Sequence, residues 1–334
     1  MSRMNLHWVT DHSPVLPEPA APIEKLPRLV FEARIIYWKS MRILVTGGAG
    51  FIGGNLVSRL ASRGVGHIRV LDNLHRGYSR ESLPATVEFL RGDIRDPEVL
   101  ADALKGCEIV FHLAAQSNVM GAVADATYSF STNVVGTFNV LQAAAAAGVK
   151  RLVFPSSREV YGDPRGIPVP ETAPLRAKNA YGASKIAGEV YCRLAAQQGL
   201  ETVVLRLANV YGPGDRDRVI PLFAAAANAG LLIIVFGRQK ILDFVWIDVV
   251  VDALLQAAFG SYIRGPVNVG SGKGTPIVDL AQRMVELTRS VSKIKVVEER
   301  EQEVGRFVAD ITRAKRLLKI PEPDDPLWAL SRSI

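Results

Sequence analysis

The stretch Thr46-Gly47-Gly48-Ala49-Gly50-Phe51-Ile52-Gly53 decides the fold of this chain. It follows the apolar run 41–45, which predicts a buried parallel strand, and it leads into residues 51–63, whose periodicity predicts an amphipathic helix. Glycines spaced three apart at such a turn let the chain turn tightly, let backbone approach a pyrophosphate and let helix pack closely on strand. The start of the helix offers free N–H groups and a positive dipole end to phosphate. The stretch therefore predicts a dinucleotide-binding turn.

A second predicted strand, 67–71, ends at Asp72, which follows Gly53 by 19 residues. A glycine-rich turn alone could be an ordinary loop, but a carboxylate at about this spacing binds a ribose diol and repels a 2′-phosphate. The predicted cofactor is therefore NAD in preference to NADP.

Length and composition set the class of protein. The 334 residues, of which 48% are apolar, suffice for a large α/β domain with a smaller lobe. No apolar run approaches the ~20 residues of a membrane helix, and the start lacks the apolar core of a secretory signal. Cys107 and Cys192 show neither metal nor disulfide spacing, which favours core thiols in a cytoplasmic protein.

The net charge of +7 suits an anionic substrate. The basic residues are scattered and no strip of them alternates with aromatic residues, so we expect neither a nucleic-acid partner nor a membrane partner. No metal site is expected either.

Strands and helices alternate from Met41 onward. Residues 133–147 form an alanine-rich helix that ends at Gly148, a typical C-cap glycine. Further strands are predicted at 87–90, 108–112, 151–155, 202–207 and 266–269. This βαβ alternation predicts an α/β fold, with a doubly wound parallel (Rossmann) sheet and a smaller α/β substrate-binding lobe.

We expect the chain to have three parts. Residues 1–40 are rich in proline between Pro14 and Pro27 and are expected to be a disordered extension; either they are a genuine tail or translation begins at Met41. The predicted NAD-binding domain comprises 41–208 and 240–269. The predicted substrate-binding lobe comprises 209–239 and 270–334.

Two further stretches carry chemistry. In Tyr181-Gly182-Ala183-Ser184-Lys185, the tyrosine and the lysine are four apart and share a helix face. A lysine cation beside a phenol is expected to lower its pKa and to make it a usable base, although such a pair can also be plain surface. Ser156 and Ser157 follow a predicted strand, where the ends of parallel strands face the ligand crevice, so a hydroxyl there can bond a sugar oxygen.

Together these motifs resemble an extended short-chain dehydrogenase/reductase of the nucleotide-sugar epimerase/dehydratase branch. The resemblance runs from Met41 to about Lys319. It also rests on the stretches 91–96, 112–116, 206–213, 243–248 and 268–272, which occur in the family's order.

The resemblance implies a role for each of a set of residues. The catalytic residues would be Ser157, Tyr181, Lys185 and Glu159. The cofactor would be bound by Gly47, Gly50, Phe51, Ile52, Gly53, Asp72, Asn73, Asp93, Ile94, Leu113, Ala114, Ala115, Gln116, Asn133, Tyr181 and Lys185. The substrate would be bound by Ser157, Arg158, Asn209, Arg216, Arg218 and Arg300, with Asn209 and Arg300 at its diphosphate. A homodimer is also implied, formed by two helices of each subunit.

Three departures from the family pattern stand out. Leu242 replaces an arginine that commonly helps to hold the diphosphate, and Arg238 or Lys240 could compensate. Val249 stands where a second aspartate is usual, with an expected structural effect. The chain ends soon after Pro321, Pro323 and Pro326, where a further helix is usual, which puts the stability of the lobe in question.

The family's reactions all begin with loss of the C4 proton to Tyr181 and of hydride to NAD. The 4-keto sugar is then re-reduced on the other face, dehydrated, or decarboxylated if it is a glucuronate. Arg158 cannot serve as the acid that dehydration needs, because guanidinium keeps its proton; Glu159 leaves decarboxylation open. The expected activity is therefore 4-epimerisation of a nucleotide sugar, such as UDP-glucose or UDP-glucuronic acid.

Three alternatives remain at this stage: UDP-glucuronate decarboxylase, 4,6-dehydratase and a catalytically silent NAD-binding protein. Arg158, Arg216 or Arg218 could pair with a C6 carboxylate, which would favour the glucuronate. Equally, the two arginines of the 214–218 loop could be solvated or bonded to their neighbouring aspartates.

Overall fold

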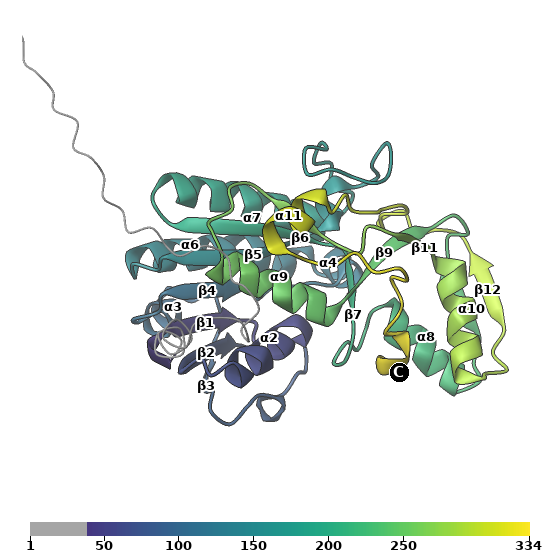
Figure 1. Ribbon diagram of the computed structural model, residues 1–334, viewed down its shortest axis with the longest axis horizontal. Helices are drawn as coiled ribbons and strands as arrows, with labels where there is room; N and C mark the ends of the chain where they lie inside the picture. The colour runs from purple at the N-terminus through teal and green to yellow at the C-terminus, as the bar shows by residue number, and fades with distance from the viewer. Residues whose placement is uncertain (1–38) are drawn as a thin grey trace, which may run out of the picture.

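A seven-stranded parallel sheet forms the centre of the computed structural model, which describes residues 39–334 (Figure 1). The expectation for residues 1–38 lies outside this range. The strand order is β10-β6-β5-β4-β1-β2-β3, and every neighbouring pair is parallel. The strands are β1 (Arg42–Thr46), β2 (His67–Asp72), β3 (Glu88–Arg91), β4 (Ile109–His112), β5 (Arg151–Ser157), β6 (Glu201–Leu207) and β10 (Val267–Val269). The predicted strands and the doubly wound fold are confirmed.

Helices cover both faces of this sheet. On one face lie α2 (Phe51–Ser62), α9 (Ile247–Phe259) and α11 (Thr312–Leu318); on the other lie α3 (Pro97–Ala103), α6 (Thr137–Ala146) and α7 (Ala180–Gln197). Side chains alternate accordingly along β1, where Ile43 and Val45 belong to the first core and Leu44 to the second. Such strands, buried on both faces, explain the continuous apolar runs of the sequence.

The remaining elements lie mostly at one end of the main sheet or beside it. Strands β7 (Asn209–Tyr211), β9 (Ile241–Trp246) and β11 (Gly274–Pro276) form a small sheet, and β8 (Ile233–Phe236) pairs with β12 (Ile294–Val297). The helices α8 (Val219–Asn228) and α10 (Ile277–Thr288) pack together at that end. The others are α4 (Val119–Ala124), α5 (Ala126–Phe130), the π-helix η3 (Ser131–Gly136) and the 3₁₀ turns η2 (Arg80–Ser82), η4 (Arg158–Tyr161) and η5 (Leu330–Arg332).

The segment 240–269 is shared between the two regions. Its strand β9 pairs with β7 and β11 of the small sheet, whereas its helix α9 packs on β5 and β6 of the main sheet. The boundaries between the two parts of the chain therefore stay a prediction. Val249 of α9 stands where the family pattern has a second aspartate. Its side chain packs against the apolar core, which fits a structural role.

The end of the chain packs back onto the small sheet. The Tyr211 hydroxyl donates to the carbonyl of Pro326 at 2.8 Å, and the ring of Trp328 lies 5.8 Å from that of Trp246. Arg283 of α10 makes two hydrogen bonds to Asp325, of 2.9 and 2.6 Å. Leu327, Ala329 and Leu330 are buried, so the short chain end adds core of its own.

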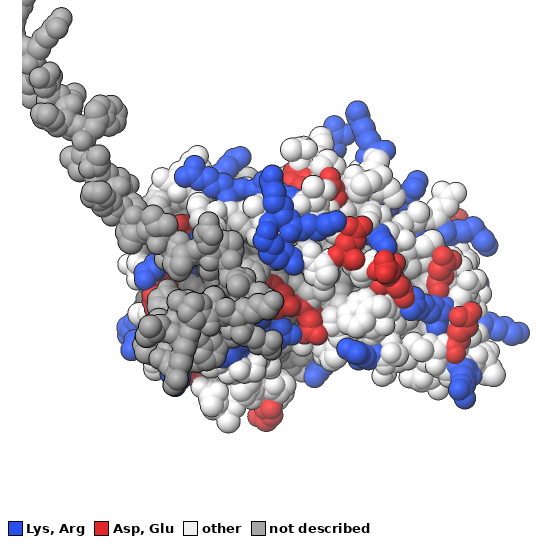
Figure 2. All heavy atoms as spheres, viewed as in Figure 1, with Lys and Arg blue, Asp and Glu red and all other residues white. Residues whose placement is uncertain are grey.

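Lysine and arginine side chains are spread over the face shown in Figure 2, with acidic side chains between them. None of the helices within residues 39–334 is long and apolar enough to cross a membrane.

A buried ion pair ties α7 to β6. Arg206 donates to both carboxylate oxygens of Glu189, at 2.7 and 2.9 Å, and also to the hydroxyl of Tyr161 at 2.8 Å. The side chains of Arg206 and Glu189 are only 5% and 9% exposed. Removing one member of such a pair leaves the other charge buried without compensation.

We therefore expect Arg206→Met to lower the free energy of unfolding by about 3–5 kcal/mol, measured by urea denaturation. The matched control is Lys105→Met, which removes the partner of Asp102 from a pair whose side chains are 75% and 63% exposed. That variant should unfold like the wild type. Equal effects of the two substitutions would contradict the assignment.

Candidate active site

A cavity of about 710 Å³ opens at the carboxyl ends of the main strands. It extends from the glycine turn after β1 past the ends of β4 and β5 to β7, α8, β8 and β9. A doubly wound sheet binds its ligand at this edge, where the strand order changes direction between β1 and β4. Both regions of the fold thus contribute to one cavity.

The glycine turn leaves room that only glycine allows. Gly47 has φ +68°, and a Cβ there would lie 2.5 Å from the Ala114 nitrogen. A Cβ at Gly53 would lie 2.2 Å from the Gly47 carbonyl oxygen, so helix and turn touch directly. Gly50 faces the cavity, and a Cβ there would meet nothing closer than 3.4 Å. The cradle fits a pyrophosphate, as the sequence predicts.

The start of α2 is free to bind an anion. Within the described part of the chain, no side chain caps this helix, and its first turn carries no acidic residue. The N–H groups of the first turn and the positive end of the helix dipole therefore face the cavity without a competing carboxylate.

Asp72 is held in position by two backbone amides. Its carboxylate accepts hydrogen bonds from Ala49 at 3.0 Å and from Leu74 at 2.8 Å, while burial raises its pKa. The free lone pairs suit a ribose diol. Asn73 and Ile94 also line the cavity.

Asp93 and Asn133 lie behind the lining. The Arg95 guanidinium and hydrogen bonds hold the pKa of Asp93 at about 2, and this carboxylate accepts from the Asn73 amide at 3.0 Å. Asn133 bonds the backbone N–H and carbonyl of Gln116, at 2.7 and 3.0 Å, and donates to Ser184 at 3.0 Å. In the structure, both act by positioning residues that line the cavity. The other predicted cofactor residues line it themselves.

Tyr181 and Lys185 lie in the first turns of α7, where the side chain of Asn179 caps the helix. The Lys185 ammonium donates to the carbonyl of Pro155 at 2.8 Å and lies 5.8 Å from the centre of the Tyr181 ring. Ser157, at the end of β5, hydrogen bonds the Tyr181 phenol. The structure thus brings these three side chains together at the cavity.

The expected lowering of the phenol pKa is wrong for this structure. Burial raises the pKa of Tyr181 to about 12, and burial lowers that of Lys185 to about 8. Arg218 and Arg76 are the cations that act to lower the Tyr181 pKa, whereas the Lys185 ammonium donates to the backbone carbonyl of Pro155. Desolvation outweighs the proximity of the lysine.

Glu159 is fully engaged. One carboxylate oxygen forms an ion pair with Arg158 at 2.9 Å, and the other accepts from the Asn179 amide at 2.8 Å. Arg158 also donates to Asn209 at 3.2 Å. Glu159, Arg158 and Asn209 line the cavity, as does Ser157, whereas Asn179 does not. The carboxylate is therefore already neutralised and held by neighbours from the protein.

The two loop arginines have different places. Arg218 lines the cavity, forms an ion pair with Asp215 at 3.3 Å and lies over the Phe51 ring. Arg216 is exposed outside the lining: it stacks on Tyr78 and donates to the Gly77 carbonyl at 3.0 Å. The structure therefore does not bring Arg216 to the cavity, because the side chain contacts Gly77 and Tyr78 of another loop.

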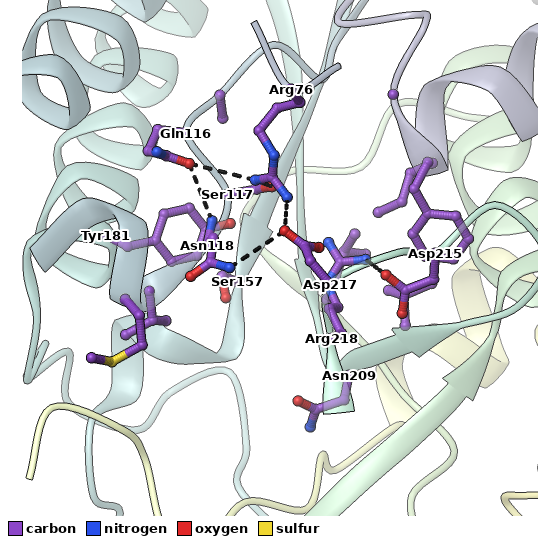
Figure 3. Close-up of a pocket in the computed structure, with 18 of the residues that line it drawn as sticks. Arg76, Gln116, Ser117, Asn118, Ser157, Tyr181, Asn209, Asp215, Asp217 and Arg218 are labelled. Carbon is purple, nitrogen blue, oxygen red and sulfur yellow. Dashed lines mark hydrogen bonds and ion pairs between the residues drawn. The ribbon is translucent and has the colours of Figure 1, made fainter. Parts of the chain in front are cut away.

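Figure 3 shows a bridge across the cavity that sequence reasoning missed. Arg76, from the loop after β2, forms an ion pair with Asp217 and donates to Ser117 at 3.2 Å. Asn118 also donates to Asp217, at 3.4 Å. The alternating Asp-Arg-Asp-Arg of 215–218 was visible in the sequence, but nothing there indicated a partner 141 residues earlier.

The comparisons with known proteins identify the class. Residues 43–270 match the NAD dependent epimerase/dehydratase family, and the chain belongs to this family. The chain is 34% identical over 294 residues to the UDP-glucose 4-epimerase of Mycolicibacterium smegmatis, covering 83% of this chain and 92% of that protein.

Solved structures agree with this assignment. A UDP-glucose 4-epimerase from Thermotoga maritima with UDP-glucose has a TM-score of 0.83 at 32% identity, covering 88% of this chain and 97% of the other. The Thermus thermophilus UDP-glucose 4-epimerase in complex with NAD has a TM-score of 0.81, also at 32% identity, with the same coverage. The cofactor of this chain is NAD, which the glycine turn and Asp72 fit. UDP-glucuronic acid decarboxylases and a dTDP-glucose 4,6-dehydratase are also similar, so likeness alone does not single out the reaction.

We expect Asp72→Asn to reduce the preference for NAD over NADP about tenfold, because it removes the charge that repels a 2′-phosphate. The measurement is the ratio of the two dissociation constants, by calorimetry. Asp102→Asn, an exposed control outside the cavity, should leave the ratio unchanged. An unchanged ratio in Asp72→Asn would mean that another residue selects the cofactor.

Proposed function

We propose that this chain is a NAD-dependent 4-epimerase of a nucleotide sugar, a UDP-hexose or UDP-hexuronate such as UDP-glucose or UDP-glucuronic acid. The engagement of Glu159 carries this proposal. One carboxylate oxygen of Glu159 is paired to Arg158 and the other accepts from Asn179, so both are already engaged by the protein and neither points to a role at C5 of a sugar. A 4-keto hexose formed in this cavity is then reduced back to an alcohol.

Ser157, Tyr181 and Lys185 form the proton-transfer unit. Ser157 holds the C4 oxygen of the sugar, and Tyr181 takes the hydroxyl proton and later returns it. NAD, when bound, supplies the hydride acceptor and its positive charge. Burial raises the Tyr181 pKa to about 12 even though Arg218 and Arg76 act to lower it, so the phenol depends on a further positive charge, such as that of NAD, to act as a base.

The other branches fit less well. Dehydration needs both a base at C5 and an acid for the leaving hydroxyl, and position 158 holds an arginine. Decarboxylation remains the second candidate, because Arg158 and Arg218 line the cavity and could bind a glucuronate carboxylate. A catalytically silent protein is the least favoured, because Ser157, Tyr181 and Lys185 are all present and lie together.

We also propose a homodimer formed through α6 and α7. These neighbouring helices expose apolar side chains, and the ring of Phe138 packs 5.3 Å from that of Tyr191 between them. The exposed apolar residues on this side of the molecule are Val123, Phe130, Val135, Phe138, Val190 and Leu194. Several exposed apolar side chains on helices that pack against α7 are typical of a subunit interface.

We expect Tyr181→Phe to bind NAD with unchanged affinity but to lose turnover by about a thousandfold, because the ring remains while the transferable proton is removed. Turnover is measured with UDP-glucose and UDP-glucuronic acid, and NAD binding by calorimetry. Turnover close to that of the wild type would remove Tyr181 from the proton-transfer role.

The reaction itself is tested by a product assay on UDP-glucose and UDP-glucuronic acid, read by mass spectrometry and proton NMR. Unchanged mass with an inverted C4 centre is the expected result. Loss of carbon dioxide from the glucuronate would establish the decarboxylase instead, and loss of water the dehydratase. No change in any nucleotide sugar, with NAD bound, would support the silent protein.

The interface is tested with the double variant Val190→Glu, Leu194→Glu. We expect light scattering to give the mass of a dimer for the wild type and of a monomer for the variant, since charges would be buried in the interface. Val291→Glu is the control. Val291 is a highly exposed apolar side chain between α10 and β12, which are not part of the proposed interface. A monomeric wild type would contradict the proposal.

A further inference from the structure

Two cations and one carboxylate gather at the end of the cavity that is remote from the glycine turn. Lys240 precedes β9, and Arg300 and Glu303 lie in the segment after β12; all three line the cavity. The Lys240 ammonium pairs with one oxygen of Glu303, and Arg300 donates to the other at 3.1 Å. Burial by itself would raise the pKa of Glu303, but these two cations lower it overall. The group therefore carries a net positive charge.

Lys240 has donors to spare. Its residue is only 6% exposed, yet an ammonium has three N–H donors, and Glu303 is its hydrogen-bond partner within residues 39–334. Burying an ammonium is costly unless it is paired. The Arg300 guanidinium lies 3.7 Å from the centre of the Phe236 ring and donates one hydrogen bond to Glu303, which uses one of its five N–H donors. The arrangement is built to meet an anion.

Lys240 directly precedes β9, two residues before Leu242, and both residues line the cavity. Asn209, on the neighbouring strand β7, also lines it and donates to the backbone carbonyl of Asp243. Leu242, Asn209, Lys240 and the Arg300–Glu303 pair thus all line the same cavity.

We infer that Lys240 is the second cation that binds the diphosphate of the substrate, together with Arg300, and so replaces the arginine that the family resemblance places at position 242. This inference rests on the proposed function, because it assumes a nucleoside diphosphate in the cavity. Glu303 is a positioning residue: it holds two like charges near one another, which would otherwise repel. A diphosphate bears enough charge to engage both.

The experiment measures the binding of UDP and of uridine to the NAD-loaded protein by calorimetry. Lys240→Met should weaken UDP binding about tenfold or more, because a charge-assisted hydrogen bond is lost, while uridine binding changes less than about twofold. Lys240→Arg should keep most of the affinity for UDP. Lys295→Met, which removes a lysine of β12 outside the cavity lining, should behave like the wild type.

A compensating variant sharpens the test. Leu242→Arg in the Lys240→Met background should restore UDP binding, since position 242 lines the same cavity and the arginine would bring a cation to it. Bound NAD and circular dichroism verify that each variant is folded. Equal UDP affinity of Lys240→Met and the wild type would overturn the inference, as would equal losses of UDP and uridine binding.

The same data separate this inference from the proposed reaction. If UDP binding depends on Lys240 but no nucleotide sugar is converted, the reaction is wrong and the role of Lys240 stands. If a nucleotide sugar is converted and UDP binding ignores Lys240, the reverse holds. Binding of none of UDP, dTDP and GDP to the wild type would overturn both.

Discussion

The buried carboxylate of Asp243 is the interaction on which the substrate end of the cavity depends. One of its oxygens accepts from both the amide and the hydroxyl of Ser271, each at 2.7 Å, and the other accepts from Gly272 and Ala309 at 3.1 and 3.0 Å. Burial raises its pKa to about 6, and these donors oppose that shift. Asp243 thus joins β9, the turn after β10 and the segment before α11, and its backbone carbonyl accepts from Asn209 of the cavity lining.

Burial also governs the chemistry at the other end. Desolvation favours the neutral forms of Tyr181 and Lys185: it raises the pKa of the tyrosine and lowers the pKa of the lysine, although the two side chains lie close together. Arg76 and Arg218 oppose this shift at Tyr181 only in part, and each of them is paired with an aspartate of the 215–217 loop. The ion pairs of this loop therefore hold the two cations that act on the phenol.

Most of the fold could be predicted from the sequence because its signals are local. Continuous apolar runs marked the parallel strands, and the glycine spacing marked the first turn, since close backbone contact admits no Cβ at Gly47 or Gly53. The helical segment 133–147 was less well predicted: its beginning belongs to the π-helix η3, where Asn133 bonds Gln116 and Ser184 from distant parts of the chain. Local helix propensity cannot predict hydrogen bonds to residues that are distant in the sequence.

The sequence by itself determined the dinucleotide turn, the place of Asp72 at the end of β2 and the shared helix face of Tyr181 and Lys185, because each depends on spacing within a few residues or one βαβ unit. Only the tertiary structure decided that Arg216 leaves the cavity, that Glu159 is occupied, and that Lys240 meets Glu303 63 residues away. The direction of a long charged side chain is set by the partners that surround it. Those partners come from strands and loops that the fold, not the order of residues, brings together.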